Sequence, residues 1–345
     1  MNKIGVLILA IMTLLCSACN QTVSEPTKGI KKSTEAQTEV AQSEGGSEVH
    51  YPVSLKIYTD EGKEMTQTIE REPKKVVVIG SAMAEFMIEF GQKEKVVGLG
   101  YLDQSFSKHA DQISQLPLLT KLWPSKESVL ALQPDLIYAV SYAFKENRLG
   151  DIAFWNERGI PVVTAGNFNM GITVESYFQD IRSFGLVFHT EDKTDEFLKE
   201  QTARMDKIKK LAATATEKPK VLLMANAGRE NYDYYPPDWC MIDEMIEGAG
   251  GEYLQMTKEG YVEMSTEAII AANPDKIIVT QFQENDSEAV KNKLLTNERL
   301  KNVQAIKTGN VMVADYTNAI RGSLQLADLY EEVAAFIHPE WFGGQ

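Results

Sequence analysis

One segment of eleven residues occurs twice in the chain and constrains its fold more than any other feature. Residues 127–137 (ESVLALQPDLI) and 267–277 (EAIIAANPDKI) match without a gap at an offset of 140 positions (267 − 127), and they share Glu, Ala, Pro, Asp and Ile. Because proline cannot continue a helix, each copy predicts a short helix, a break at Pro–Asp and a buried strand. Chance similarity between two helix–strand units is the alternative. We favour two similar α/β lobes.

Apolar runs elsewhere extend this alternation of strands and helices. A helix is predicted from Ala82 to Phe90, with Gly91 in the position of a C-terminal cap. Strands that alternate with helices indicate parallel sheets covered by helices on both faces. The predicted strands are Lys75–Ile79, Val96–Leu99, Leu136–Val140, Pro161–Thr164, Val221–Met224, Ile277–Thr280 and Val311–Ala314.

A long helix is predicted between the two lobes. Apolar residues recur at helical spacing between Phe197 and Leu211, and Pro219 marks the end of the segment. Acidic residues gather at its start and lysines at its end, which suits the helix dipole. The expected division is an N-terminal lobe over 51–189, a bridging helix over 190–216 and a C-terminal lobe over 217–345.

The N-terminus has the pattern of a secretion signal. A lysine precedes an apolar run from Ile4 to Leu15, which is too short for a membrane-spanning helix. Small residues then lead to Cys19, which resembles the lipobox of bacterial lipoproteins, although Cys16 stands where leucine is usual. An ordinary secretory signal is the alternative. We predict a lipoprotein signal peptide over 1–18, lipidation of Cys19 and a flexible polar tether over 19–50.

Charge and cysteine content narrow the classes of function. The 345 residues include 49 Asp and Glu against 35 Lys and Arg, a net charge of −14, so nucleic acid is rejected as a partner. With 43% hydrophobic residues, the chain can bury a core. Once the signal is removed and Cys19 is lipidated, Cys240 is the remaining thiol. No intrachain disulfide is therefore expected, and Cys240 is predicted to be a small buried side chain.

From about Tyr51 to Phe342 the chain resembles the substrate-binding lipoproteins of ABC importers for iron–siderophores, haem and cobalamin. The resemblance rests on the lead-in EPKKVVV at 72–78, the repeated Glu and Pro–Asp unit and the long central helix. It implies two Rossmann-like lobes with parallel sheets, joined by a rigid helix, with the ligand in the cleft between them. It also implies an ABC permease with its ATPase as partner, and an extracytoplasmic protein anchored by lipid to the bacterial cell membrane.

The same resemblance implies a role for the repeated glutamates. In such proteins one acidic residue at the top of each lobe docks against arginines of the permease, and Glu127 and Glu267 stand at the matching positions. Two charges on separate rigid lobes would fix both the place and the register of a partner. The alternative is that each glutamate only favours the first turn of its helix.

Loops at the carboxyl ends of parallel strands are where open α/β sheets bind ligands, and here these loops are rich in aromatic residues and arginine. Aromatic rings cover flat or apolar ligands, and arginine offers a planar fork to carboxylates or metal-bound oxygens. For each residue the alternative is packing or solvation, and Met83 could also ligate haem iron. The candidate contacts are Ser81, Met83, Tyr101, Trp123, Tyr142, Arg148, Arg229, Tyr232, Tyr235, Trp239 and Arg321.

Other classes of function find less support in the sequence. A lipid-anchored hydrolase using Ser81 or Cys240 lacks a GxSxG motif, and neither GxxxxGK[ST] nor GxGxxG is present for nucleotides. HExxH is absent as well, and the CxxC formed by Cys16 and Cys19 falls within the predicted signal and lipobox. A bare zinc or manganese site is disfavoured because the four histidines are scattered, at His50, His109, His189 and His338. A receptor for a host protein stays open as an alternative.

The expected function is therefore non-enzymatic, with no cofactor. We expect a monomer that captures a chelated metal complex and presents it to a permease, with little movement between lobes because the connecting helix is rigid. The count of arginines favours an anionic ferric siderophore, and the aromatic loops leave haem or a corrinoid as the alternative ligand.

Overall fold

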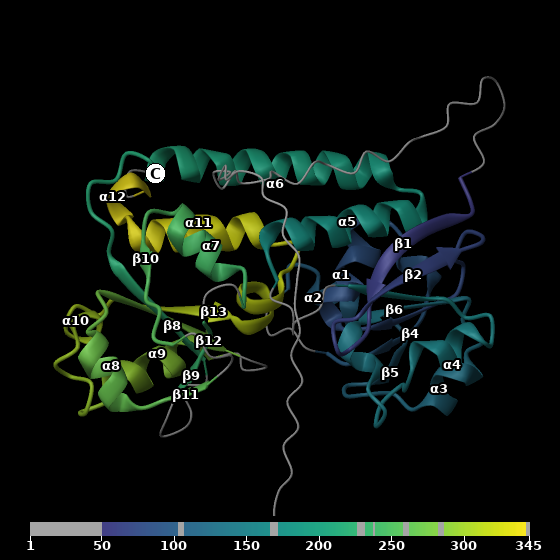
Figure 1. Cartoon of the computed structure of the whole chain (residues 1–345), viewed down its shortest axis with the longest axis horizontal. Helices are drawn as coiled ribbons and strands as arrows, with labels where there is room; N and C mark the ends of the chain where they lie inside the picture. Colours follow the sequence, from purple (N-terminus) through teal and green to yellow (C-terminus); the bar gives the residue numbers. More distant parts are fainter. Residues whose placement is uncertain are drawn as a thin grey trace, which may run out of the picture. The chain divides into compact units, whose positions relative to one another are not determined.

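The structure is a computed structural model that describes residues 50–102, 107–165, 172–225, 232–236, 239–257, 262–281 and 286–342. All of them belong to one compact unit, residues 49–345, which contains two α/β lobes (Figure 1). The predicted signal peptide, Cys19 and the tether up to residue 49 lie outside the described ranges. Within those ranges, no helix has the length and apolar character needed to cross a membrane.

A five-stranded parallel sheet forms the centre of the N-terminal lobe. Its strands are β3 (Val76–Ile79), β4 (Val96–Gly100), β5 (Leu118–Thr120), β6 (Leu136–Val140) and β7 (Val162–Ala165). Their order across the sheet is β5–β4–β3–β6–β7, so the direction of winding reverses between β3 and β6. Every residue of these two central strands is buried, as expected where helices cover both faces. The loops after such strands meet at one edge of the sheet, where ligands bind.

Short helices connect the strands of this lobe. α1 begins one residue earlier than predicted because Gly80, with φ 117° and ψ 128°, turns the chain directly from β3 into the helix. The elements are α1 (Ser81–Glu89), η1 (Lys93–Lys95), α2 (Ala110–Ile113), α3 (Lys126–Ala131), η2 (Ser141–Phe144) and α4 (Ile152–Asn156).

An antiparallel hairpin that the sequence reading did not include precedes the sheet. Its strands are β1 (Val53–Tyr58) and β2 (Glu64–Ile69). Along β1 buried and exposed residues alternate, which is the pattern of a strand with one face on the core. The hairpin joins the lobe through Thr164 of β7, whose hydroxyl accepts from Tyr58 N at 2.8 Å and donates to Tyr58 O at 2.9 Å.

The sheet of the C-terminal lobe is mixed. Its strands are β8 (Lys220–Ala225), β9 (Tyr232–Tyr234), β10 (Glu252–Tyr253), β11 (Val262–Met264), β12 (Lys276–Gln281) and β13 (Val311–Asp315). The order is β11–β9–β8–β12–β13, with β10 paired to β8. The three long strands are parallel, as predicted, whereas β9 and β11 add an antiparallel edge. These edge strands have three residues each, too few for a periodic pattern to reveal them.

Helices and turns surround the second sheet. Cys240 lies just before α7 and is buried, as predicted, and burial raises the pKa of its thiol. The elements are α7 (Ile242–Gly248), α8 (Thr266–Ala272), α9 (Ser287–Leu295), α10 (Gln304–Lys307), the single π-turn η4 (Thr317–Arg321), α11 (Leu326–Ile337) and α12 (Pro339–Phe342).

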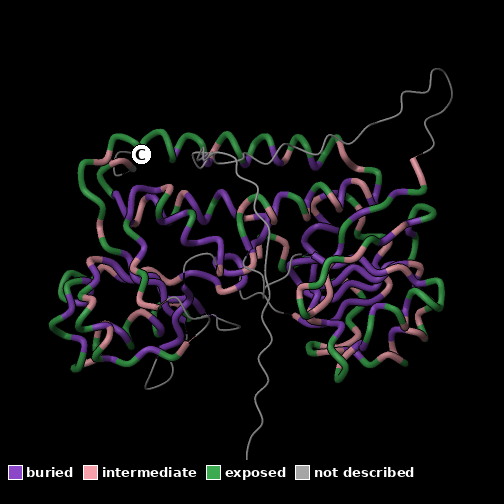
Figure 2. Tube along the Cα trace, in the orientation of Figure 1, coloured by how far each residue is buried: buried purple, intermediate pink, exposed green. Residues whose placement is uncertain are grey.

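Two consecutive helices link the lobes, α5 (Val174–Phe188) and the long α6 (Glu191–Ala212). α5 is anchored in the N-terminal lobe, since the ring of Phe184 lies 5.6 Å from those of both Phe86 and Tyr138. α6 has 22 residues and runs along one side of the unit, with one face exposed (Figures 1 and 2). The predicted long central helix is thus present, and the two-lobed α/β fold is confirmed.

The second half of α6 is fastened to the C-terminal lobe through α11. Gln201 is buried and its side-chain oxygen accepts from Ala327 N at 3.1 Å. Arg204 donates to both carboxylate oxygens of Glu331 at 2.9 and 2.8 Å, and to Asp328 at 2.5 Å. These bonds raise the pKa of Arg204 and lower that of Glu331. α5 is therefore fixed in the N-terminal lobe, and the second half of α6 in the C-terminal lobe.

The sequence repeat is also a structural repeat. α3 and α8 begin at N-caps Ser125 and Ser265, whose hydroxyls accept from the backbone N–H three residues on. After each helix, the aspartate of the Pro–Asp pair accepts a hydrogen bond from the backbone N–H at the start of a neighbouring strand. Asp135 accepts from Lys75 N at 2.8 Å before β3, and Asp275 accepts from Lys220 N at 2.9 Å at the start of β8. The shared aspartate is therefore a structural anchor in both lobes.

Candidate ligand-binding site

Four of the candidate residues converge in the N-terminal lobe. Tyr101, directly after β4, stacks on Trp123 with ring centroids 3.8 Å apart and planes at 16°. Tyr142 in η2 meets both rings edge-on, at 5.8 and 5.5 Å. The Arg148 guanidinium lies 3.7 Å from the centroid of Trp123 and donates to Tyr142 O at 2.8 Å. We call these four residues the aromatic–arginine cluster.

Arg321 brings the C-terminal lobe to the same place. It is the last residue of η4, and its Nη1 donates to the hydroxyl of Tyr142. Its guanidinium lies 4.8 Å from the Tyr142 ring and 5.3 Å from that of Tyr316. Burial lowers the pKa of Arg148. The positive charge of Arg321 lowers it as well, whereas Tyr101 and Tyr142 raise it. Two guanidinium groups from different lobes thus share one aromatic surface.

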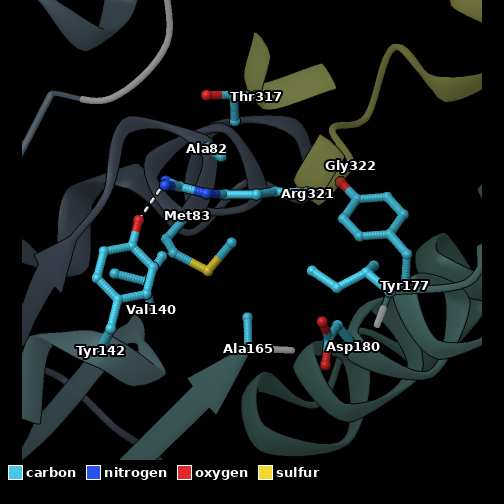
Figure 3. A pocket seen from close by; sticks show the side chains of 11 residues that line it. Ala82, Met83, Val140, Tyr142, Ala165, Tyr177, Asp180, Thr317, Arg321 and Gly322 are labelled. Carbon is cyan, nitrogen blue, oxygen red and sulfur yellow. Dashed lines mark hydrogen bonds between the residues drawn. The ribbon is translucent and has the colours of Figure 1, made fainter. Parts of the chain in front are cut away.

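A cavity of about 30 Å³ lies beside this meeting point. Met83 of α1, Tyr142 and Arg321 line it, together with Tyr177 and Asp180 of α5. Figure 3 shows Arg321 reaching across to the hydroxyl of Tyr142, with Asp180 and Tyr177 on the opposite side. Pockets for drug-sized ligands have roughly 300–1,000 Å³. The cavity is therefore much smaller than a pocket for a drug-sized ligand.

Further contacts join the two lobes. Gln325 donates to Glu85 of α1 at 3.2 Å, and Val174 N at the start of α5 donates to Glu244 of α7 at 3.0 Å. The backbone of Gly322 lies so close to the Tyr177 ring that an added Cβ would stand 2.7 Å from it. Together with the Arg321–Tyr142 contact they form an inter-lobe seam, which we define by Gly322–Tyr177, Gln325–Glu85, Val174–Glu244 and Arg321–Tyr142.

Ser81 lies at a different cavity of about 190 Å³ in the N-terminal lobe. Leu99, Leu102, Ile113 and Ser107 are among its lining residues, so its wall is largely apolar. It is the larger of the two cavities, but among the described residues its lining includes no arginine and none from the C-terminal lobe. The smaller inter-lobe cavity is therefore the better candidate for a site formed by both lobes.

The remaining candidates are not among the residues that line the inter-lobe cavity, or they lie outside the described ranges. Tyr232 and Tyr235 are buried in the C-terminal lobe, where the Tyr232 hydroxyl accepts from Asn297 at 3.2 Å and Tyr235 O accepts from Tyr253 at 2.6 Å. Trp239 is half-buried in the turn before α7. Ligand contact by these three stays a prediction. Arg229 lies outside the described residues.

The sequence reading missed the polar groups that α1 and α5 contribute. Glu85 is fully buried, accepts from the Ser107 hydroxyl, and stands in the otherwise apolar segment SAMAEFMI. That isolated carboxylate was the available signal, because charged residues are seldom fully buried without a partner. Burial, and then Glu85, raises the pKa of the Tyr177 hydroxyl well above its usual value. Neither Tyr177 nor Asp180 could be placed at the cavity from local pattern.

The two repeated glutamates occupy equivalent exposed positions in the first turns of α3 and α8. In Figure 1 these helices lie on the side of the lobes away from α6. Each carboxylate accepts a hydrogen bond from the backbone N–H of the same residue, and this bond is the main cause that lowers its pKa. Glu267 also pairs with Arg299 at 2.5 Å, whereas Glu127 is held by the Ser125 hydroxyl. Both are anionic at neutral pH.

Comparison with known proteins now decides the family. The family model described as "Periplasmic binding protein" matches residues 76–316, which span both sheets and the helices between them. The chain belongs to the periplasmic binding protein family. Its two-lobed architecture, with a seam and cavity between the lobes, agrees with a substrate-binding role.

Curated relatives cover most of this periplasmic binding protein. An ABC transporter substrate-binding lipoprotein, YvrC of Bacillus subtilis, is 23% identical over 85% of this chain and 87% of its own. The petrobactin-binding protein YclQ of the same organism is 26% identical over 91% and 92%. A cobalamin-binding protein of Halobacterium salinarum is 25% identical over 73% and 66%.

Solved structures share the fold. A periplasmic binding protein from Veillonella parvula superposes with a TM-score of 0.75 at 18% identity, over 86% of this chain and 94% of its own. A periplasmic haem-binding protein from Pseudomonas aeruginosa gives a TM-score of 0.64 at 23% identity, over 77% and 93%. At these identities the likeness establishes the architecture alone.

Proposed function

We propose that the ligand of this periplasmic binding protein is an iron–siderophore complex with anionic or oxygen-rich groups on its periphery. The role of substrate-binding protein for an ABC importer follows from the family and from the curated relatives. The petrobactin-binding relative supports a siderophore in particular. Binding and release, without catalysis, are the chemistry that this role requires.

The aromatic–arginine cluster with Arg321 is the observation that carries the proposal. The Arg148 guanidinium lies over the Trp123 ring and contacts Tyr142, and Arg321 reaches Tyr142 from the other lobe. Two partly desolvated guanidinium groups gain more from an anionic partner than they would in water, because the local dielectric constant is lower. The net charge of −14 opposes the approach of an anion at long range, so these local cations must provide the attraction.

Substitution of the arginines tests this proposal. Arg148→Met and Arg321→Met each remove hydrogen bonds to a charged group worth about 1.5–3 kcal/mol, so affinity for a ferric siderophore should fall roughly 10–100-fold. Arg158→Met is the matched control, because Arg158 also covers a ring, Phe154 at 3.6 Å, but belongs neither to the aromatic–arginine cluster nor to the cavity lining. Unchanged affinity in both Arg148→Met and Arg321→Met would reject the arginine contacts.

Haem or a corrinoid is the second candidate ligand. Met83 lines the inter-lobe cavity and offers a thioether to iron, and the stacked pair Tyr101–Trp123 suits a flat conjugated ring. The cobalamin-binding relative supports the corrinoid alternative. A Met83→Leu variant separates the possibilities, since haem coordinated by this sulfur would change its absorption spectrum and a siderophore would bind as before.

We further propose that Glu127 and Glu267 dock the two lobes against arginines of the permease. Their support is the structural repeat, which places both carboxylates on equivalent exposed first turns. Glu267 already pairs with Arg299, a surface contact that a permease arginine can replace because exposed ion pairs contribute little.

Charge reversal separates docking from ligand binding. The double variant Glu127→Lys/Glu267→Lys should abolish uptake of radiolabelled iron complex by cells and leave the affinity of purified protein unchanged. The control reverses Glu94 and Glu298, whose side chains are 89% and 85% exposed. Weakened ligand binding in the Glu127/Glu267 variant, or normal uptake, would reject the docking role.

The proposed location is the outer face of the cytoplasmic membrane, as a monomer held by a lipid on Cys19. The family consists of extracytoplasmic binding proteins, and the relative YvrC is named as a lipoprotein. Cys19→Ser tests the anchor, because the variant should appear in the medium or the soluble extracytoplasmic fraction. Retention in the membrane fraction would contradict lipidation at this residue.

A further inference from the structure

The turn between α5 and α6 brings together two histidines that are 139 positions apart (189 − 50). The rings of His50 and His189 stack with centroids 4.0 Å apart and planes at 10°. His50 Nδ1 lies 3.5 Å from a carboxylate oxygen of Glu191, the first residue of α6. One ligand atom from each of the three residues fits within a mutual distance of 4.8 Å.

The hydrogen bond of His50 Nε2 determines which nitrogen of the ring carries the proton. Nε2 lies 2.7 Å from Leu186 O, and because a carbonyl oxygen only accepts, Nε2 carries the proton of the neutral ring. Nδ1 then presents its lone pair toward the carboxylate of Glu191, an arrangement that a cation between them would stabilise. Histidines that bind metals commonly donate their other ring N–H to a backbone carbonyl, which orients the ring in the same way.

The spacing selects a class of ion. Two ligands at 2.0–2.1 Å from a tetrahedral ion stand about 3.4 Å apart, close to the 3.5 Å between His50 Nδ1 and Glu191. Imidazole nitrogens with one carboxylate suit zinc and the neighbouring transition ions, whereas calcium and magnesium require oxygen ligands. His189 is exposed, so its ring has room to leave the stack and turn a nitrogen toward the ion.

The surroundings favour a positive charge. Leu186 and Val187 are in the last turn of α5, and their carbonyl oxygens accept from His50 and from the Tyr51 hydroxyl at 2.8 Å. The C-terminal end of a helix carries partial negative charge. The Glu191 carboxylate and the end of α5 thus both favour a cation at this corner of the molecule.

We propose that His50, His189 and Glu191 bind a divalent transition-metal ion, with Zn²⁺ as the preferred occupant and water completing the coordination. A zinc site was disfavoured because the histidines are scattered along the sequence. The turn between α5 and α6 nevertheless places His189 beside His50. The site is formed by residues other than those of the inter-lobe cavity. Metal bound here would cross-link the segment that leads into β1 to the junction of α5 and α6.

Calorimetric titration with Zn²⁺, using the whole chain extracted in detergent and free of affinity tags, tests the site. We expect one Zn²⁺ per chain and a melting temperature that rises with Zn²⁺ and not with Ca²⁺ or Mg²⁺. His50→Ala, His189→Ala and Glu191→Gln should each weaken binding at least about 10-fold. Co²⁺ bound to the wild type should show visible absorption bands of a nitrogen-ligated tetrahedral ion.

His109→Ala is the matched control, because His109 also meets a carboxylate, Glu89 at 2.6 Å, but no second histidine is grouped with it among the described residues. It should bind Zn²⁺ as the wild type does. His189 is exposed, so its variant should keep the fold and the melting temperature measured in EDTA. Equal Zn²⁺ affinity in the wild type and His189→Ala, or loss of binding in His109→Ala alone, would overturn the proposal.

Discussion

Gly322 at the inter-lobe seam should not tolerate a single added methyl group. Its φ of 91° and ψ of 153° lie in a region that is essentially restricted to glycine, so alanine there costs about 1–3 kcal/mol in backbone strain. The new Cβ would also stand 2.3 Å from Met241 Cε and 2.7 Å from the buried Tyr177 ring. Overpacking of this kind costs a further 1–3 kcal/mol or so. Gly322→Ala should therefore lose about 2–6 kcal/mol of a total of roughly 5–15 kcal/mol.

Urea denaturation followed by circular dichroism measures this loss. Gly309→Ala is the control, because Gly309 has a φ of 69° but no atom within 4 Å of the added Cβ. Backbone strain alone should cost that variant about 1–2 kcal/mol. Beyond a difference in backbone strain, the gap between the two variants then reports the packing of Gly322 against Met241 and against Tyr177 of the other lobe. If Gly322→Ala destabilises no more than Gly309→Ala, the close packing of the seam is refuted.

Three further perturbations test the anchors of the fold. Arg204→Met should lower the free energy of unfolding by about 1 kcal/mol, as expected for a partly exposed, bidentate pair, and unchanged urea midpoints would contradict the fastening of α6 to α11. Because Arg204 lowers the folded-state pKa of Glu331, the wild-type advantage should be complete above the unfolded pKa of about 4.3 and should vanish as the pH falls through the lowered folded value. A urea series between pH 7 and 3 shows whether the two proteins converge on the acid side. Asp135→Ala and Asp275→Ala should each cost about 1 kcal/mol, measured in the same way, and a loss in one lobe alone would argue against equivalent anchors.

Much of the fold followed from local pattern, because buried strands and long helices have strong periodic signals. β3 and β6 are runs of apolar residues, β12 contains the apolar run Ile277–Val279, and α6 was predicted from its spacing and charged ends. The β1–β2 hairpin was missed although buried and exposed residues alternate along β1. β9 and β11 are too short to show periodicity, and their pairing depends on contacts distant in sequence.

The candidate site was predictable only in part. Tyr101, Trp123, Tyr142 and Arg321 were found because they follow strands or lie in loops, where α/β sheets bind ligands. Their mutual contacts, such as Arg321 with Tyr142 across 179 positions, depend on the packing of one lobe against the other. The stacked His50 and His189 show the same limit, since only the turn between two helices makes them neighbours.

Tryptophan fluorescence, with a ferric siderophore, haem and cobalamin titrated in parallel, tests the proposed ligand most directly. Of the chain's four tryptophans, Trp123 lies in the aromatic–arginine cluster. We expect the ferric siderophore to quench fluorescence saturably at the lowest concentration, and Trp123→Phe to lose most of that quenching. The iron-free siderophore and free tryptophan control for absorption by the ligand itself. Saturable quenching by haem or cobalamin alone, or quenching unchanged in Trp123→Phe, would contradict a siderophore held at this cluster.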